Sequence, residues 1–304
     1  MPYFSEIERI LQSKFKVGES FLLGQKTYTV VDSGKPRPSS GECKTDLYIF
    51  ADSVGIKKEF KISIKLSNAE FLENKTNSTR AKEIFGPMWS DVITNASKSI
   101  QNKFCNLHDL IKYSSKSNTY TITLGWKFEI FNDTSRTLQV PPNLSNTQKV
   151  EVLSGFNLSD DKKNALVNGR EITNSGVADY ILEINTDDNI LDKDLNSIIK
   201  TIIPIKNYSL SMPNMNFGFT ALNYRSDGDK WDGDRPLAVW IDWKIKNSKL
   251  SGKVMFSNPL VTKGNEIGKN LQILLDSLDI RKEYISESEL RECIDNLNIF
   301  HTIK

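Results

Sequence analysis

The chain has few of the residues that build disulfide-rich or zinc-binding proteins. Its 304 residues include three cysteines and two histidines. The cysteines, Cys43, Cys105 and Cys293, are isolated and odd in number, which argues against a disulfide framework and against a structural zinc site. His108 is interpreted as a surface or helix histidine. These counts are typical of a protein in a reducing compartment.

Long hydrophobic runs are also missing. No apolar run approaches the roughly 18 residues that a membrane-spanning helix needs. The first residues lack the basic region and apolar stretch of a secretory signal. With 38% hydrophobic and 26% charged residues, the composition is that of a globular protein. We therefore expect a cytoplasmic location and no membrane partner.

The chain also lacks an excess of charge of one sign. The chain has 40 basic and 38 acidic side chains, which leaves a formal net charge of +2. A protein that coats nucleic acid indiscriminately carries a larger positive excess. A site-specific binder can concentrate positive charge in one cleft, so composition does not exclude one.

The spacing of apolar residues predicts a chain that mixes helices and strands. A period of two predicts strands, and a period near 3.6 predicts helices. Strands are expected over 19–24, 27–32, 118–131, 178–184, 216–224, 237–246 and 249–256, and helices over 3–14, 68–75, 79–85, 88–103, 265–278 and 287–297. The predicted fold class is α/β or α+β, with a mixed central sheet flanked by helices and a β-rich second part.

The composition also changes along the chain. Residues 132–176 are rich in Asn, Asp, Ser and Thr, and we interpret them as a linker or peripheral insertion. They separate a first part, residues 1–131, from a β-rich part with C-terminal helices, residues 177–304. The later part is a candidate for sequence recognition or dimerisation.

Two early segments predict a β-hairpin that brings an acid, a hydroxyl and a lysine together. Apolar and polar residues alternate along both segments, before and after a turn centred near Val54 and Gly55. Pairing the segments about this turn sets Asp46 across from the stretch Ser63 to Lys65. Ser63 and Lys65 share one face of their strand.

Asp46 and Lys65 suggest a site for a divalent cation and a phosphate. Mg²⁺ prefers oxygen ligands, usually one or two carboxylates, with water and substrate phosphate in the remaining positions. Asp46 can supply such a carboxylate. A bound ion would polarise a scissile phosphate and lower the pKa of an attacking water, and Lys65 would orient that water or stabilise charge on the phosphorane.

These residues resemble the motif of the PD-(D/E)XK nuclease superfamily, which includes many type II restriction endonucleases. In the usual motif a proline precedes the first acid and a second acid stands two places before the lysine. This chain has Thr45 and Ser63 at those places. Some restriction enzymes with Ser-x-Lys draw the missing carboxylate from the following helix, where this chain has Glu70 and Glu73. Glu42 is a further candidate.

The resemblance covers only residues 40–75 and implies an endonuclease that hydrolyses DNA phosphodiesters with Mg²⁺, for which Mn²⁺ can substitute. Residues 1–131 would form its nuclease-like core. The implied catalytic set is Asp46, Lys65, Ser63 and Glu70, and the implied metal ligands are Asp46, Glu70, Glu73 and Glu42. Double-stranded DNA is the implied partner, and cleavage of both strands of a palindrome implies a homodimer by analogy.

The same residues permit plainer interpretations. Asp46 and Lys65 can form an ordinary cross-strand ion pair, worth under about 1 kcal/mol when exposed. Ser63 can be a small residue on a crowded sheet face. Ser67 and Glu70 match a capping box at the start of a helix. The rival functions are a non-catalytic nucleic-acid-binding protein with a degenerate nuclease core, and an interaction or inhibitor protein.

Several basic residues are candidates for DNA contact. Two project from a Pro-, Ser- and Gly-rich loop that leads to Asp46, and two share a face of a predicted strand with Trp240. The full set is Lys35, Arg37, Lys44, Arg80, Lys244 and Lys246. The alternative for each is a solvated loop, a helix end or an ordinary half-buried sheet.

Overall fold

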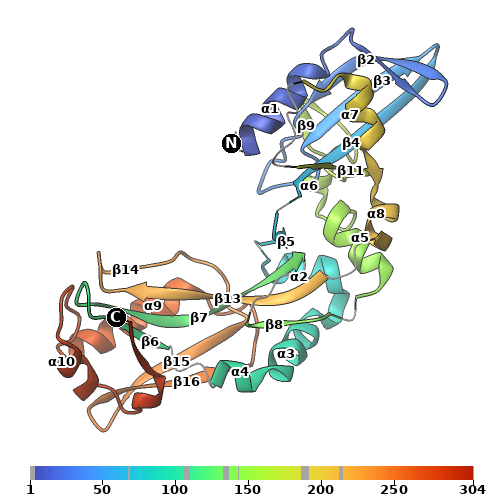
Figure 1. The fold of residues 1–304 in the computed structure, drawn as a ribbon. Helices are drawn as coiled ribbons and strands as arrows, with labels where there is room; N and C mark the ends of the chain where they lie inside the picture. Colours follow the sequence, from blue (N-terminus) through green and yellow to red (C-terminus); the bar gives the residue numbers. More distant parts are fainter. Residues whose placement is uncertain are drawn as a thin grey trace. The chain divides into compact units, whose positions relative to one another are not determined.

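The structure, a computed structural model, divides the chain into two units, each built from two separate stretches (Figure 1). The first unit comprises residues 1–72 and 143–214, and the second comprises residues 73–142 and 215–304. The predicted segments 1–131, 132–176 and 177–304 do not coincide with these units, because the chain leaves the first unit and later returns to it. The residues described are 4–67, 69–74, 76–105, 110–132, 137–142, 144–185, 192–211 and 215–303, so His108 lies outside them.

The first unit is built around a mixed six-stranded sheet. Its strands are, in order, β1 (Ser20–Leu23), β2 (Lys26–Gly34), β3 (Leu47–Ser53), β4 (Ile56–Leu66), β11 (Tyr180–Ile184) and β12 (Ile203–Pro204). Neighbours are antiparallel except β4 and β11, which are parallel. A parallel pair needs a crossover connection. Here the crossover is the whole chain from 67 to 179, which explains why the unit is discontinuous in sequence.

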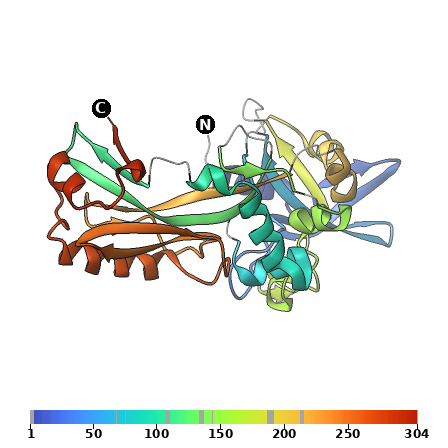
Figure 2. The same cartoon turned by 90° about the horizontal axis from the view of Figure 1, so that it is seen from below.

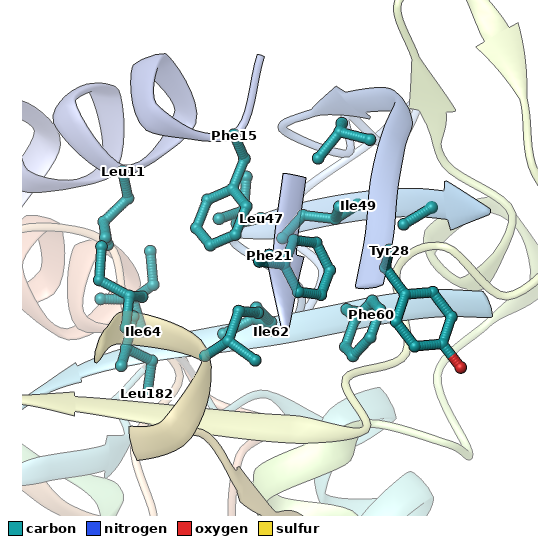
Figure 3. Packing of buried hydrophobic residues seen from close by; sticks show 14 of the residues in the cluster. Leu11, Phe15, Phe21, Tyr28, Leu47, Ile49, Phe60, Ile62, Ile64 and Leu182 are labelled. Carbon is teal, nitrogen blue, oxygen red and sulfur yellow. The ribbon is translucent and has the colours of Figure 1, made fainter. Parts of the chain in front are cut away.

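Helices α1 (Phe4–Lys14) and α7 (Leu195–Thr201) supply buried residues to the core on one face of this sheet. Figure 3 shows Leu11, on α1, and Phe15, directly after this helix, pointing toward the sheet residues Leu47 and Ile64. The unit also contains α5 (Asn146–Ser154), α6 (Asp160–Lys163), α8 (Ile205–Ser211), β9 (Leu166–Val167) and β10 (Arg170–Glu171). Because side chains alternate along β4, Ser63 and Lys65 point away from this core.

The predicted hairpin of β3 and β4 is confirmed. The two strands are antiparallel, and Val54 and Gly55 form the connection between them. Both residues have positive φ, 52° and 83° respectively. This is the geometry of a type I′ turn, whose twist matches that of the flanking strands. The turn fixes the register and thereby the face on which each side chain of β4 lies.

The second unit contains a larger sheet with the strand order β14 (Lys230–Trp231), β13 (Met215–Arg225), β7 (Thr119–Asn132), β15 (Val239–Lys246) and β16 (Lys249–Met255). Four short strands extend it: β5 (Phe71–Glu73), β6 (Ile111–Ser114), β8 (Gln139–Val140) and β17 (Phe300–Ile303). Its helical segments are α2 (Ser78–Phe85), η1 (Gly86–Met88), α3 (Trp89–Ser99), α4 (Gln101–Cys105), α9 (Gly264–Ser277), α10 (Glu287–Glu292) and η2 (Leu297–Ile299). Helix α9 packs against β15 and β7 (Figure 2).

One predicted helix, over residues 68–75, is wrong. The described part of this stretch contains a short strand, β5 (Phe71–Glu73), where the chain passes between the units. The N–H of Ser67 donates to the carbonyl of Ile184 at 2.9 Å, which continues the pairing of β4 with β11 by one residue. Ser67 is therefore committed to the sheet and does not act as the N-cap of a helix that contains Glu70.

The other predicted elements are confirmed with shifted ends. The helix predicted over 88–103 is divided into α3 and α4, and the predicted linker contains α5 and α6. The mixed sheets flanked by helices confirm the predicted fold class. None of the helices that the structure describes is long and apolar enough to span a membrane.

Candidate functional site

The carboxylate of Asp46 is held against β4. Leu47 lies opposite Ile62, so Asp46 stands opposite Ser63, as predicted. The N–H of Asp46 donates to the carbonyl of Ile62 at 2.9 Å, and its carboxylate accepts from the N–H of Ile64 at 2.8 Å. The Ser63 hydroxyl donates to the same carboxylate oxygen over a long 3.4 Å. The hairpin register therefore positions this side chain.

Lys65 lies two residues beyond Ser63, on the same face of β4. Its ammonium lowers the pKa of Asp46, which shows that the two charges interact. No acidic side chain in the described part of the chain forms an ion pair with Lys65. Asp46 and Lys65 therefore interact without a direct ion-pair contact between them in the described part of the chain.

Burial raises the pKa of Asp46 from an ordinary value of 3.8 to about 6. Loss of water around the carboxylate is the largest cause, because burial disfavours the charged form. Lys65 and the N–H of Ile64 lower this pKa, whereas the carboxylate of Glu8 raises it. A carboxylate destabilised in this way is stabilised by a cation placed beside it.

Glu8 is the acidic residue that sequence reasoning missed. It lies on α1, one position after the buried Ile7, and its side chain is only 12% exposed. Its carboxylate pairs with the ammonium of Lys35 at 2.5 Å. The polar face of a helix gives no signal that one of its acids lies near a distant aspartate, so only the packing of α1 on the sheet reveals Glu8.

A pocket of about 520 Å³ opens beside Asp46 within the first unit. One wall is the start of α1, including Glu8, and the other is the segment that leads into β3. Glu42 and Arg37, both exposed, line it as well. Ser63 and Lys65 are not among the described residues that line it. The pocket therefore gives a ligand access to Asp46 from the side of α1.

Two further polar side chains line this pocket. The hydroxyl of Thr45 is buried and has no hydrogen-bond partner in the described part of the chain. The thiol of Cys43 has its pKa raised to about 11, chiefly by burial. Burial therefore favours the protonated thiol of Cys43, which is the less nucleophilic form.

The three glutamates predicted to complete a metal site have different surroundings. Glu42 lines the pocket, whereas Glu70 is exposed after the end of β4 and does not. Glu73 belongs to the second unit, where its carboxylate pairs with Arg80 at 2.9 Å. The structure therefore brings Glu42 and Glu8 to the pocket of Asp46, in place of Glu70 and Glu73.

The six predicted DNA-contact residues also differ in burial and in ion pairing. Arg80 is buried and pairs with Glu83 at 3.2 Å as well as with Glu73, so its guanidinium serves the fold. Lys35 pairs with Glu8, and Lys44 is half-buried. The remaining three side chains are exposed, and they are Arg37, Lys244 and Lys246.

The donor set fits Mg²⁺ better than a softer metal. Among the described residues, no three His, Cys, Asp or Glu side chains gather closely enough to hold a metal ion. Mg²⁺ does not need three, because it usually keeps several waters and takes one or two carboxylates. Asp46 and Glu8 supply two carboxylates beside one pocket, and the raised pKa of Asp46 favours a cation there.

Comparison of the chain with protein-family models, with curated proteins and with solved structures found no match. The functional argument therefore depends on the chemistry of the residues around Asp46.

Proposed function

We propose that this protein is a Mg²⁺-dependent endonuclease that hydrolyses phosphodiester bonds of double-stranded DNA, in the manner of a type II restriction endonuclease. The observation that carries the proposal is that the fixed, destabilised carboxylate of Asp46 interacts with the ammonium of Lys65, which forms no ion pair with a described residue. Asp46 is bonded to Ile64 at 2.8 Å, and Lys65 follows Ile64 directly. A cation and a phosphate are the groups that such a pair binds.

Each residue of the site has a distinct role in this proposal. Asp46 and Glu8 would hold Mg²⁺, or Mn²⁺ in its place, and Glu42 would hold a coordinated water. When bound, the ion would polarise the scissile phosphate and lower the pKa of the attacking water. Lys65 orients the attacking water and stabilises negative charge on the phosphorane. Ser63 donates a hydrogen bond to Asp46 and so acts as a positioning residue.

Arg37 is the residue best placed to bind DNA at this pocket. It is exposed, lines the pocket and forms no ion pair with a described residue. A guanidinium binds phosphate through two parallel hydrogen bonds, which orient as well as attract. Arg37 would therefore hold a phosphate that flanks the scissile bond.

The test is cleavage of supercoiled plasmid with Mg²⁺ and with Mn²⁺ at pH 8. We expect Asp46→Asn and Lys65→Met each to lower the rate at least about a hundredfold, the range expected for groups that stabilise a transition state. Lys57→Met, an exposed lysine on the same strand, and Asp91→Asn, an exposed aspartate on α3, are the matched controls. Cleavage at the wild-type rate by both site variants would show that Asp46 and Lys65 take no part in the reaction.

The same reaction tests the proposed homodimer. Two active sites related by a two-fold axis cut both strands of a palindromic target and yield linear plasmid. A single site per binding event yields nicked circles. Linear product at protein concentrations where light scattering shows a dimer supports the dimeric enzyme.

Two observations favour a second candidate, a non-catalytic DNA-binding protein. Ser63 stands where the usual motif has an acid, and Glu8 is already neutralised by Lys35. Under this alternative the protein binds DNA without a metal ion, and neither wild type nor the Asp46 variant cuts it. Binding that is indifferent to Mg²⁺, together with no cleavage by any preparation, would establish this alternative.

A further inference from the structure

The hairpin of β15 and β16 carries four lysines on one face, which we call the lysine face. In the register of these strands, Lys246 lies opposite Lys249, and Asp242 lies opposite Lys253. Side chains directly opposite each other share a face, and Lys244 lies two residues from both Asp242 and Lys246. All four lysines are exposed.

The positive charge of the lysine face is largely uncompensated. Lys244 pairs with Asp242 at 2.7 Å, and the other three lysines form no ion pair with a described residue. Lys246 and Lys249 oppose each other directly, an arrangement of like charges that destabilises a sheet. The cost is removed when an anion lies across the two ammonium groups.

The backbone presents this face on the two-stranded ribbon of β15 and β16, and at Leu250 the ribbon also bridges to Ile294. Within the described residues, β15 pairs with β7 only at Val239 and Trp240, so its later residues pair with β16 alone. The ribbon's other face is apolar, since Trp243 packs over Gly252 and α9 packs against β15 (Figures 1 and 2). The lysine face is therefore the face open to a partner.

We infer that the lysine face binds the phosphate backbone of duplex DNA, without regard to base sequence. The major groove of B-DNA admits a two-stranded ribbon, and lysines bind the phosphates that border it. Lysines two residues apart on one strand face are about 6.6 Å apart, so neighbouring ammonium groups reach separate phosphates. The choice of DNA as the partner rests on the proposed function, whereas the binding itself needs neither Asp46 nor a metal ion.

Fluorescence anisotropy with a short labelled duplex of arbitrary sequence, in EDTA, tests this inference. The variant changes Lys244, Lys246, Lys249 and Lys253 to Gln, and the control changes four exposed lysines elsewhere on the second unit, Lys98, Lys116, Lys230 and Lys269, to Gln. Both changes remove the same charge. We expect the lysine-face variant to bind at least about tenfold more weakly, with a salt dependence of log K reduced by about 3, because each lost phosphate contact removes about one unit.

Unchanged affinity of the lysine-face variant, or an equal loss in the control, would overturn the inference. The double variant Lys246→Gln/Lys249→Gln guards against misfolding. We expect its Tm to be equal or higher, because a like-charge pair is removed, while its DNA affinity falls. Since these assays contain no metal ion, their failure is distinct from a failure of plasmid cleavage.

Discussion

Glu8 and Lys35 form an ion pair, 2.5 Å from oxygen to nitrogen, at the pocket that leads to Asp46. The pair joins the first helix to the segment that follows β2, two elements that the sequence separates. Its ammonium lowers the pKa of Asp46, whereas its carboxylate raises it. Lys35 therefore supplies positive charge to both carboxylates.

Replacing Lys35 should strengthen metal binding. In Lys35→Met no ammonium competes for Glu8, and loss of a partly exposed ion pair worth under about 1 kcal/mol corresponds to an affinity for Mg²⁺ raised by about threefold. Isothermal titration with MgCl₂ at pH 8 measures the change. Lys26→Met, an exposed lysine on β2, is the control. Weaker binding in Lys35→Met would mean that Lys35 orients Glu8 instead of competing for it.

The stability of the protein should depend on the charge of Asp46. Its pKa is about 6 in the folded state against 3.8 ordinarily, so between these values the folded state binds more protons than the unfolded state. Stability is then lost as pH rises from about 4 to 6, and stays lower above that.

The substitution Asp46→Asn removes this loss, because a neutral amide can still accept from Ile64. At pH 8 without metal ion, we expect a free energy of unfolding higher than that of wild type by about 1 to 3 kcal/mol. Near pH 4 the two proteins should differ little. Urea unfolding at both pH values measures this, and a difference that does not change with pH would contradict the raised pKa.

Arg80 should matter for folding and not for DNA affinity. Arg80→Met leaves Glu73 and Glu83, whose side chains are 11% and 10% exposed, without this partner. Removing one member of a buried ion pair costs about 3 to 5 kcal/mol, and partial exposure lowers that to about 2 to 4 kcal/mol. Thermal unfolding measures the loss. A folded variant with normal stability and weakened DNA binding would indicate that Arg80 contacts DNA.

The turn of the β3–β4 hairpin can be improved. Val54 is fully exposed and has a positive φ of 52°, which a β-branched residue adopts at a cost. Val54→Asn creates the Asn-Gly pair that type I′ turns prefer, and should raise the free energy of unfolding by about 1 kcal/mol. Gly55→Ala, at φ 83°, should lower it by a similar amount. Urea unfolding measures both changes. A lower free energy of unfolding for Val54→Asn together with a higher one for Gly55→Ala would exclude this turn geometry.

The sequence alone determined the local structure around Asp46. Alternation along two segments and turn residues at Val54 and Gly55 gave the hairpin, and the period of two then set Asp46 opposite Ser63 and put Lys65 on the same face. These features depend on residues close in the chain. Local patterns also predicted Ser67 as the N-cap of a helix, and this was wrong. The N–H of Ser67 instead donates a hydrogen bond to the carbonyl of Ile184, which is far along the chain.

Tertiary structure decided which other groups reach the site. Glu8 lies near Asp46 only because the apolar face of α1 packs on the sheet, and Glu73 is bound to Arg80 because the chain has by then entered the second unit. The raised pKa of Asp46 likewise comes from burial, which is produced by distant segments packing together. Local patterns fix the faces of strands and helices, whereas long-range packing fixes which faces meet and which charges lose their water.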